Sequence, residues 1–111
     1  MINQVVLVGR LCSDPQIKEL ENDVKLCYLT IACQRAYKNE NGEYDTDFIS
    51  CQLWNQVAEH TAEYCKKGDL VGIKGRIQTS SYDNDAGEKV YKQNVVVEKV
   101  TFLSSKKENN E

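Results

Sequence analysis

The sequence is poor in the residues and motifs from which enzymes, metal sites and membrane anchors are usually built. Its 111 residues include one histidine and one proline, and no CxxC, HExxH or GxxxxGK[ST] motif is present. The longest apolar runs, 5–8 and 95–97, are far too short to cross a membrane. A strand-like run starts within four residues of Met1, which predicts that no leader precedes the fold. We therefore expect no catalysis, no metal and no cofactor.

The sequence also lacks an excess of positive charge. Lys and Arg total 14 against 17 Asp and Glu, for a net charge of -3, which argues against a uniformly basic nucleic-acid coat. The charges are unevenly distributed, however. Residues 66–92 hold six cations and four anions, a local balance of +2, and the acids gather at 14–23 and 40–47. A cationic surface therefore remains possible on an acidic chain.

The five cysteines predict reduced thiols in the cytoplasm, because their number is odd and no leader is expected. Cys27, Cys33 and Cys51 lie in apolar strand-like runs, where a free cysteine acts as a small core residue. Cys12 carries no motif. A nucleophile pair of Cys65 with His60 is disfavoured, since five residues on a helix turn two side chains to different faces.

Hydrophobic periodicity predicts one domain over residues 1–103. Strands are expected over 4–11, 24–33, 47–54, 70–79 and 90–103, with a polar turn over 18–23. A hairpin is expected over 38–47, where Asn41-Gly42 is a strong turn signal, and a polar loop over 80–89. A helix is expected over 55–67, capped by Asn55 and ended by Gly68. The polar tail over 104–111 is expected to be disordered.

Three strands, one helix and two strands is the order of the oligonucleotide-binding (OB) barrel. We therefore predict an all-β, five-stranded OB barrel with its helix between the third and fourth strands.

The third strand has one apolar and one mixed face. Alternation places the apolar residues of an ordinary core on one face: Ile49, Cys51 and Leu53. The other face combines aromatic and polar residues: Phe48, Ser50, Gln52 and Trp54. Such a face makes a poor core but a good platform for unpaired bases, which stack on aromatic rings. The alternative is that Phe48 and Trp54 cover a barrel end or a subunit contact.

The fourth strand has a similar pattern. Its apolar side is Val71, Ile73 and Ile77, and its other side is Gly72, Lys74, Arg76 and Gln78. If the third and fourth strands lie side by side, cations adjoin aromatic rings and can follow the phosphates of a single strand. Taken alone, the two cations fit a solvated strand face equally well. Tyr37 and Tyr82, in expected loops, are further stacking candidates, and Tyr44 is a weaker one.

Four segments resemble the bacterial single-stranded-DNA-binding protein family from residue 2 to about 103. They are VVLVGRL at 5–11 followed by Asp14-Pro15, TDFISCQLW at 46–54, AEYCKKGDLVGIKGRIQT at 62–79, and Tyr82 with Gly87. The resemblance implies an OB domain that assembles as a homotetramer, places Ile49 and the first strand near subunit contacts, and wraps single-stranded DNA. By position it implies base stacking on Tyr37, Phe48, Trp54 and Tyr82. It implies phosphate contacts at Arg10, Lys38, Lys66 and Lys67, whereas Lys74 and Arg76 come from the strand-face argument alone.

The sequence departs from the family at its end. Members that serve replication carry a long tail closing in an acidic-apolar peptide that recruits replication and repair enzymes. Here the last residues are KKENNE, so we expect either a shortened chain or a short phage, plasmid or competence relative, with partner recruitment in doubt.

Two functions follow from these patterns. The first is sequence-independent binding and protection of single-stranded DNA in replication, recombination or repair, by a cytoplasmic, nucleoid-associated protein. The alternative is an OB-fold protein-interaction module of a primosome-type or mobile-element replication complex, favoured by the acidic net charge and the exposed aromatic residues.

Overall fold

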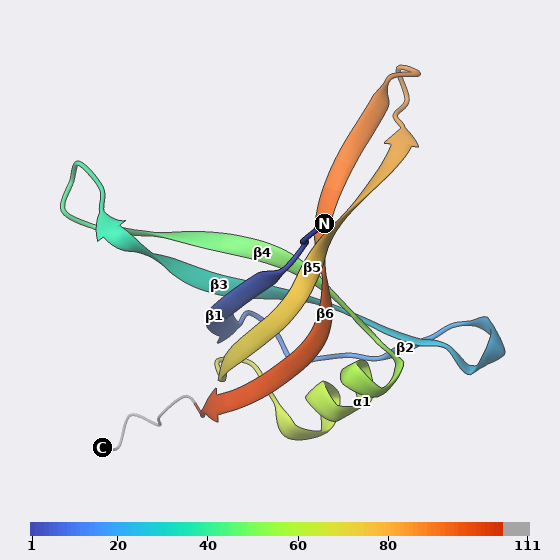
Figure 1. The fold of residues 1–111 in the computed structure, drawn as a ribbon, viewed down its shortest axis with the longest axis horizontal. Coiled ribbons are helices and arrows are strands. Elements are labelled where there is room, and N and C mark those ends of the chain that lie inside the picture. Colours follow the sequence, from blue (N-terminus) through green and yellow to red (C-terminus); the bar gives the residue numbers. More distant parts are fainter. Residues whose placement is uncertain (106–111) are drawn as a thin grey trace.

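The computed structural model describes residues 1–105 (Figure 1). Its elements in chain order are β1 (Val5–Leu11), β2 (Lys18–Glu19), the short 3-10 helix η1 (Glu21–Asp23), β3 (Lys25–Lys38), β4 (Tyr44–Trp54), α1 (Asn55–Tyr64), β5 (Leu70–Asp83) and β6 (Lys89–Ser104). Ser104, where the predicted tail begins, is the last residue of β6. Residues 106–111, the rest of that tail apart from Ser105, lie outside the described residues.

The strands form one sheet that closes on itself. Their order is β1-β5-β6-β4-β3-β2, and an additional pairing of β1 with β3 closes the barrel. Within residues 1–105, only the pairing of β4 with β6 is parallel, through Cys51 opposite Val95 and Gln52 opposite Val96. The predicted five-stranded OB barrel is therefore confirmed, with its single helix between β4 and β5. The two-residue β2 is an addition at the edge, where a turn was predicted.

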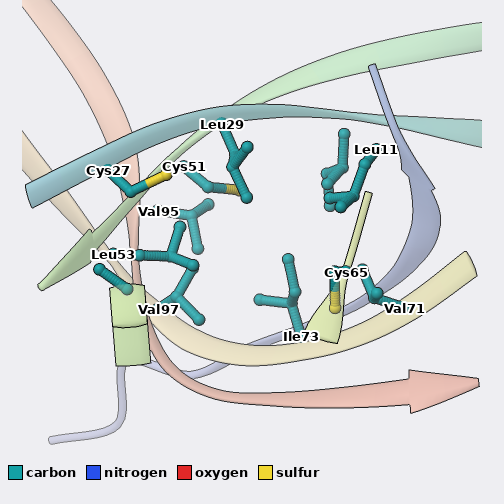
Figure 2. Close-up of a cluster of buried hydrophobic side chains, with 12 residues drawn as sticks. Leu11, Cys27, Leu29, Cys51, Leu53, Cys65, Val71, Ile73, Val95 and Val97 are labelled. Carbon is teal, nitrogen blue, oxygen red and sulfur yellow. The ribbon is translucent and has the colours of Figure 1, made fainter. Parts of the chain in front are cut away.

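The barrel interior is filled by the inward faces predicted from alternation. Ile31, Cys51, Leu53 and Val71 are fully buried, and Ile73 is nearly so. Figure 2 shows Cys27 beside Cys51 at one end of this core and Cys65 beside Val71 at the other. The full cluster is Leu11, Cys27, Leu29, Ile31, Cys51, Leu53, Ala58, Cys65, Val71, Ile73, Val95 and Val97. Burying each large aliphatic side chain contributes roughly 1.5–3 kcal/mol to folding.

The helix differs from its prediction at both ends. The Asn55 side chain does not cap it: Asn55 has φ 52°, and its Oδ1 accepts a hydrogen bond from the Lys25 N–H at 3.0 Å instead. The helix also ends at Tyr64 rather than residue 67. The chain turns there because Cys65 is extended and buried in the core. Lys66 and Lys67 consequently lie in a loop.

Two long hairpins, β3–β4 and β5–β6, extend away from the barrel as arms (Figure 1). The hairpin predicted over 38–47 is present, whereas the segment predicted as a polar loop over 80–89 is mostly paired strand. The same kind of turn joins the strands of both hairpins. In one, Asn39 Oδ1 accepts hydrogen bonds from the N–H groups of Asn41 and Glu43. In the other, Asn84 Oδ1 accepts from Ala86 and Glu88. These turns carry Gly42 at φ 79° and Gly87 at φ 78°, conformations that glycine adopts without strain.

Barrel closure depends on the close crossing of β1 and β3. Arg10 pairs with Ala32 and Leu11 with Ile31, and at this crossing a Cβ on Gly9 would lie 2.6 Å from the carbonyl oxygen of Ala32. Only glycine therefore fits between the strands. Among the described residues, no helix is both long and apolar enough to cross a membrane.

Candidate nucleic-acid interface

The outer face of β4 presents two large aromatic rings to solvent. Phe48 is 69% exposed and Trp54 is 37% exposed, while Ser50 and Gln52 between them are half-buried. The opposite face supplies Cys51 and Leu53 to the core. The predicted division of this strand into a core face and an aromatic-polar face is therefore confirmed, although Ile49 is only half-buried.

The neighbouring strand β3 adds a ring that the sequence-based site omitted. Tyr28 pairs with Gln52, so it lies on the same face as Phe48 and Trp54, and it is 58% exposed. A signal was present, because alternation along β3 already directs Tyr28 and Thr30 away from the core residues Leu29 and Ile31. We call Phe48, Ser50, Gln52, Trp54 and Tyr28 together the β3–β4 face.

The remaining predicted stacking residues lie on the arms. Tyr37 is 86% exposed near the end of β3, and Tyr82 is 56% exposed near the end of β5. Both are in strands rather than in the predicted loops. Tyr44, at the start of β4, has the Lys38 ammonium 5.8 Å from its ring centroid, so the predicted phosphate ligand Lys38 stacks on an aromatic neighbour.

Three further predicted phosphate ligands gather around the loop after α1. Arg10 is exposed, and its Nη1 donates a hydrogen bond to the Gly68 carbonyl oxygen at 2.8 Å. Lys66 and Lys67 are exposed as well, and within residues 1–105 their ammonium groups form no ion pair. The N–H of Lys66 donates to Asp69 Oδ2 at 2.9 Å, and that of Lys67 to Asp14 Oδ1 at 2.7 Å. The loop backbone is thus held while both charged heads stay in solvent.

Lys74 and Arg76 do not adjoin the rings of β4 as predicted. The strand β6 lies between β4 and β5, so the expectation that the two strands are neighbours is wrong. Lys74 pairs with Val6 and Lys99 instead. Arg76 donates to Gln78 Oε1 at 2.9 Å and lies 4.0 Å from a Glu98 carboxylate oxygen. The proposed role of both cations in phosphate binding stays a prediction.

Ile77, predicted on the apolar side of its strand with Val71 and Ile73, is not part of the core. Ile77 is 44% exposed because β5 has left the barrel for its arm at this point. It lines an apolar hollow of 420 Å³ beside Val5, Leu7, Phe48 and Ile49. The hollow therefore connects the aromatic ring of Phe48 with the apolar residues of β1.

An acidic side chain next to Phe48 is neutralised by an ion pair. The Arg35 guanidinium donates hydrogen bonds to both carboxylate oxygens of Asp47, at 2.9 Å to Oδ1 and 3.1 Å to Oδ2. These hydrogen bonds hold the pKa of Asp47 below its ordinary value. Arg35 thus offsets the negative charge that Asp47 carries beside Phe48.

Burial makes four of the five thiols poor nucleophiles. Burial raises the pKa of Cys51 to about 12 and also raises the pKa values of Cys27, Cys33 and Cys65, which disfavours the thiolate that a nucleophile or metal ligand needs. All five cysteines are unpaired thiols. Within residues 1–105, no three His, Cys, Asp or Glu side chains form a group that could hold a metal ion.

Comparison with known proteins places this geometry in a family. Residues 2–103 match the model of the Single-strand binding protein family. The chain is 45% identical to Single-stranded DNA-binding protein B of Bacillus subtilis, over 96% of this chain and 94% of that protein. It is 47% identical to Single-stranded DNA-binding protein 1 of Lactococcus lactis, over 96% of this chain and 71% of that protein.

A third relative is longer. The chain is 48% identical to the Single-stranded DNA-binding protein of Halalkalibacterium halodurans, over 93% of this chain but only 61% of that protein. The family model matches the chain from before β1 to Leu103 in β6, and so includes the barrel, the helix and both arms. The chain therefore belongs to the single-strand binding protein family.

Proposed function

We propose that this chain binds and protects single-stranded DNA without sequence preference, through base stacking and phosphate contacts. The observation that carries the proposal is the β3–β4 face, on which the rings of Phe48 and Trp54 lie exposed to solvent. Burying a large apolar side chain would contribute roughly 1.5–3 kcal/mol to folding, so exposed rings point to a binding surface. Every base has a π-face, so stacking tolerates any sequence. The names of the three relatives support the same activity.

The proposed base-stacking set is Tyr37, Phe48, Trp54 and Tyr82. The proposed phosphate ligands are Arg10, Lys38, Lys66, Lys67, Lys74 and Arg76. Neither set includes a catalytic group, and the proposal assigns the protein no enzymatic step. Its place of action would be the cytoplasm, on strands exposed during replication, recombination or repair.

The single tryptophan tests the proposal directly, because Trp54 is itself one of the proposed stacking residues. Titration with a long oligothymidine should quench its fluorescence. Higher salt should weaken the binding. A plot of log K against the logarithm of the salt concentration should have a slope of about -0.7 for each phosphate contact to a single strand. Absence of quenching together with absence of a mobility shift would overturn the proposal.

A matched pair of variants assigns the binding to the ring of Phe48. Phe48→Ala should weaken binding by about 1–3 kcal/mol, the contribution of one base stacked on one ring. Phe48→Tyr keeps an aromatic ring at the same position and should bind like the wild type. Equal binding by all three proteins would remove Phe48 from the site.

We also propose that the protein acts as a homo-oligomer, most simply a tetramer. Two observations support self-association. Residues 5–9 of β1 pair with β5 on one side, whereas β3 pairs only with Arg10 and Leu11 on the other, so much of one strand edge is open. Val6 and Val8 are also exposed on this strand, and exposed apolar strands with an open edge favour pairing with another chain. The mass in solution tests this.

A further inference from the structure

A hollow of 390 Å³ lies beside the β3–β4 face, and its walls come from three separate segments. The loop after β1, the strand β3 and the loop after α1 contribute Cys12, Ser13, Asp14, Gln16, Tyr28 and Lys67. Resting on the function proposed above, we propose that this hollow is an additional nucleotide subsite, in which a base stacks on Tyr28 and the adjoining phosphate contacts Lys67.

The Tyr28 ring continues the β3–β4 face. Tyr28 pairs with Gln52, and Leu26, two residues before it, pairs with Trp54. Tyr28 and Trp54 are therefore diagonal neighbours on one face, a separation of roughly 7–8 Å that aromatic side chains bridge. Tyr28 is 58% exposed and does not belong to the core cluster. A strand that stacks on Trp54 therefore has a further ring within reach.

Hydrogen bonds hold the two loops that line the hollow in place without any ligand. The N–H of Cys12 donates to the Thr30 carbonyl oxygen at 3.0 Å, and that of Gly68 to the Leu11 oxygen at 2.9 Å. These bonds tie both loops to the barrel, and the bond from Lys67 N–H to Asp14 Oδ1 ties the loops to each other. A preorganised site loses less ordering free energy on binding.

The charges in the hollow indicate how a nucleotide would lie. The Lys67 ammonium has no ion pair among the described residues, so it can receive a phosphate. Asp14 is the one acid in the lining, and its carboxylate would repel that phosphate. The base should therefore lie over Tyr28 with its phosphate on the side of Lys67. The volume falls in the range of about 300–1,000 Å³ typical of small-molecule sites.

Quenching of Trp54 fluorescence by oligothymidine tests the subsite, since that signal reports the main face independently. Tyr28→Ala should weaken binding about 5- to 150-fold, the loss of one stacked base, while the bound complex still quenches Trp54. Tyr28→Phe should bind like the wild type. Tyr64→Ala is the matched control, because Tyr64 is 68% exposed on α1 and does not line the hollow.

Two further variants are needed. Tyr28→Thr separates an effect on binding from an effect on folding, and Lys67→Gln tests whether Tyr28 and Lys67 act on the same nucleotide. Tyr28→Thr keeps a residue suited to strands and should lose as much affinity as Tyr28→Ala. Lys67→Gln should lower the magnitude of the salt slope by about 0.7, which Tyr28→Ala should not do. The loss in the Tyr28→Ala, Lys67→Gln double variant should be smaller than the product of the two single losses.

The inference and the proposed function fail differently. Wild-type affinity in Tyr28→Ala and Tyr28→Thr, with Trp54 quenching intact, would overturn the subsite and leave the proposed function standing. If Tyr28→Ala lost affinity for oligothymidine but Tyr28→Thr did not, the subsite would also be overturned, because the loss would then come from a weakened strand β3. If the wild type shows neither quenching nor binding, both proposals are overturned.

Discussion

At the scale of single residues, Cys51 shows how strongly the barrel interior opposes charge. Its side chain is fully buried, and burial raises the pKa of its thiol from 9.0 to about 12. The unfolded chain releases this proton from about pH 9, whereas the folded protein retains it until about pH 12. The unfolded state thus binds fewer protons in this window, so stability falls as pH rises through it.

We expect the Cys51 thiol to add no pH dependence to the free energy of unfolding below pH 9 and to make that free energy decline as pH rises above 9. Denaturant unfolding on either side of pH 9 measures this dependence. Cys51→Ala should be about 1 kcal/mol less stable below pH 9 but should show a shallower decline above it. If the unfolding free energies of the wild type and of Cys51→Ala declined in parallel above pH 9, the decline would not come from the Cys51 thiol.

Asp14 combines a structural and an electrostatic effect that one substitution separates. Its Oδ1 accepts the Lys67 N–H at 2.7 Å, and an amide oxygen can do the same. Asp14→Asn should therefore keep the thermal stability of the wild type. It should tighten oligothymidine binding by about 0.5 kcal/mol at low salt, because a carboxylate near the phosphate is removed, and the gain should shrink at high salt. An unchanged affinity at low salt would place the phosphate elsewhere.

At the scale of the elements, the sequence predicted the strands of the barrel better than the arms. The strands around Leu29, Cys51 and Ile73 each bury one face, so alternation of apolar and polar residues reveals them. The arm segments around Tyr37 and Tyr82 bury little and are held by backbone pairing and by the turns at Asn39 and Asn84. Such strands have no hydrophobic period, so Tyr37 and Tyr82 were placed in loops, although Asn41-Gly42 did predict the turn of one hairpin.

The sequence also did not predict correctly which strands pair with one another in the sheet. The face composition of β4 and of β5 was predicted correctly for Phe48, Trp54 and Lys74, yet β6 separates the two strands. Alternation specifies which way a side chain points from its own strand, whereas the pairing partner depends on how the whole sheet closes. Tyr28 was left out of the predicted site for the same reason: its pairing with Gln52 is what places it on the face that carries Phe48 and Trp54.

The crossing of β1 and β3 should be intolerant of any side chain at position 9. In Gly9→Ala the new Cβ would lie 2.6 Å from the Ala32 carbonyl oxygen, a backbone atom that cannot move without opening the barrel. We expect a loss of about 1–3 kcal/mol or more in denaturant unfolding. Gly72→Ala is the matched control, because its nearest neighbour, a Leu103 methyl carbon, is 3.7 Å away. Equal stability of the two variants would contradict this account.

At the scale of the whole molecule, the open edge of β1 leads to a prediction on assembly. Val8→Asp places a charge on an exposed apolar strand and should lower the mass in solution to that of a smaller assembly, while the folded chain keeps its stability. Leu20→Asp introduces the same charge at an exposed apolar residue between β2 and η1 and should leave the mass unchanged. A wild-type protein that is already a monomer would refute the homo-oligomer.

The two arms also set how the protein should respond to the length of its ligand. Tyr37 and Tyr82 lie on separate hairpins, while Phe48 and Trp54 lie on the barrel, so a short oligonucleotide cannot reach all of these rings. If the proposed stacking residues act together, a longer strand held on the barrel would meet the rings of the arms at a high effective concentration. Weak contacts on each arm then add up to avidity, and affinity should rise steeply with strand length until both arms are engaged.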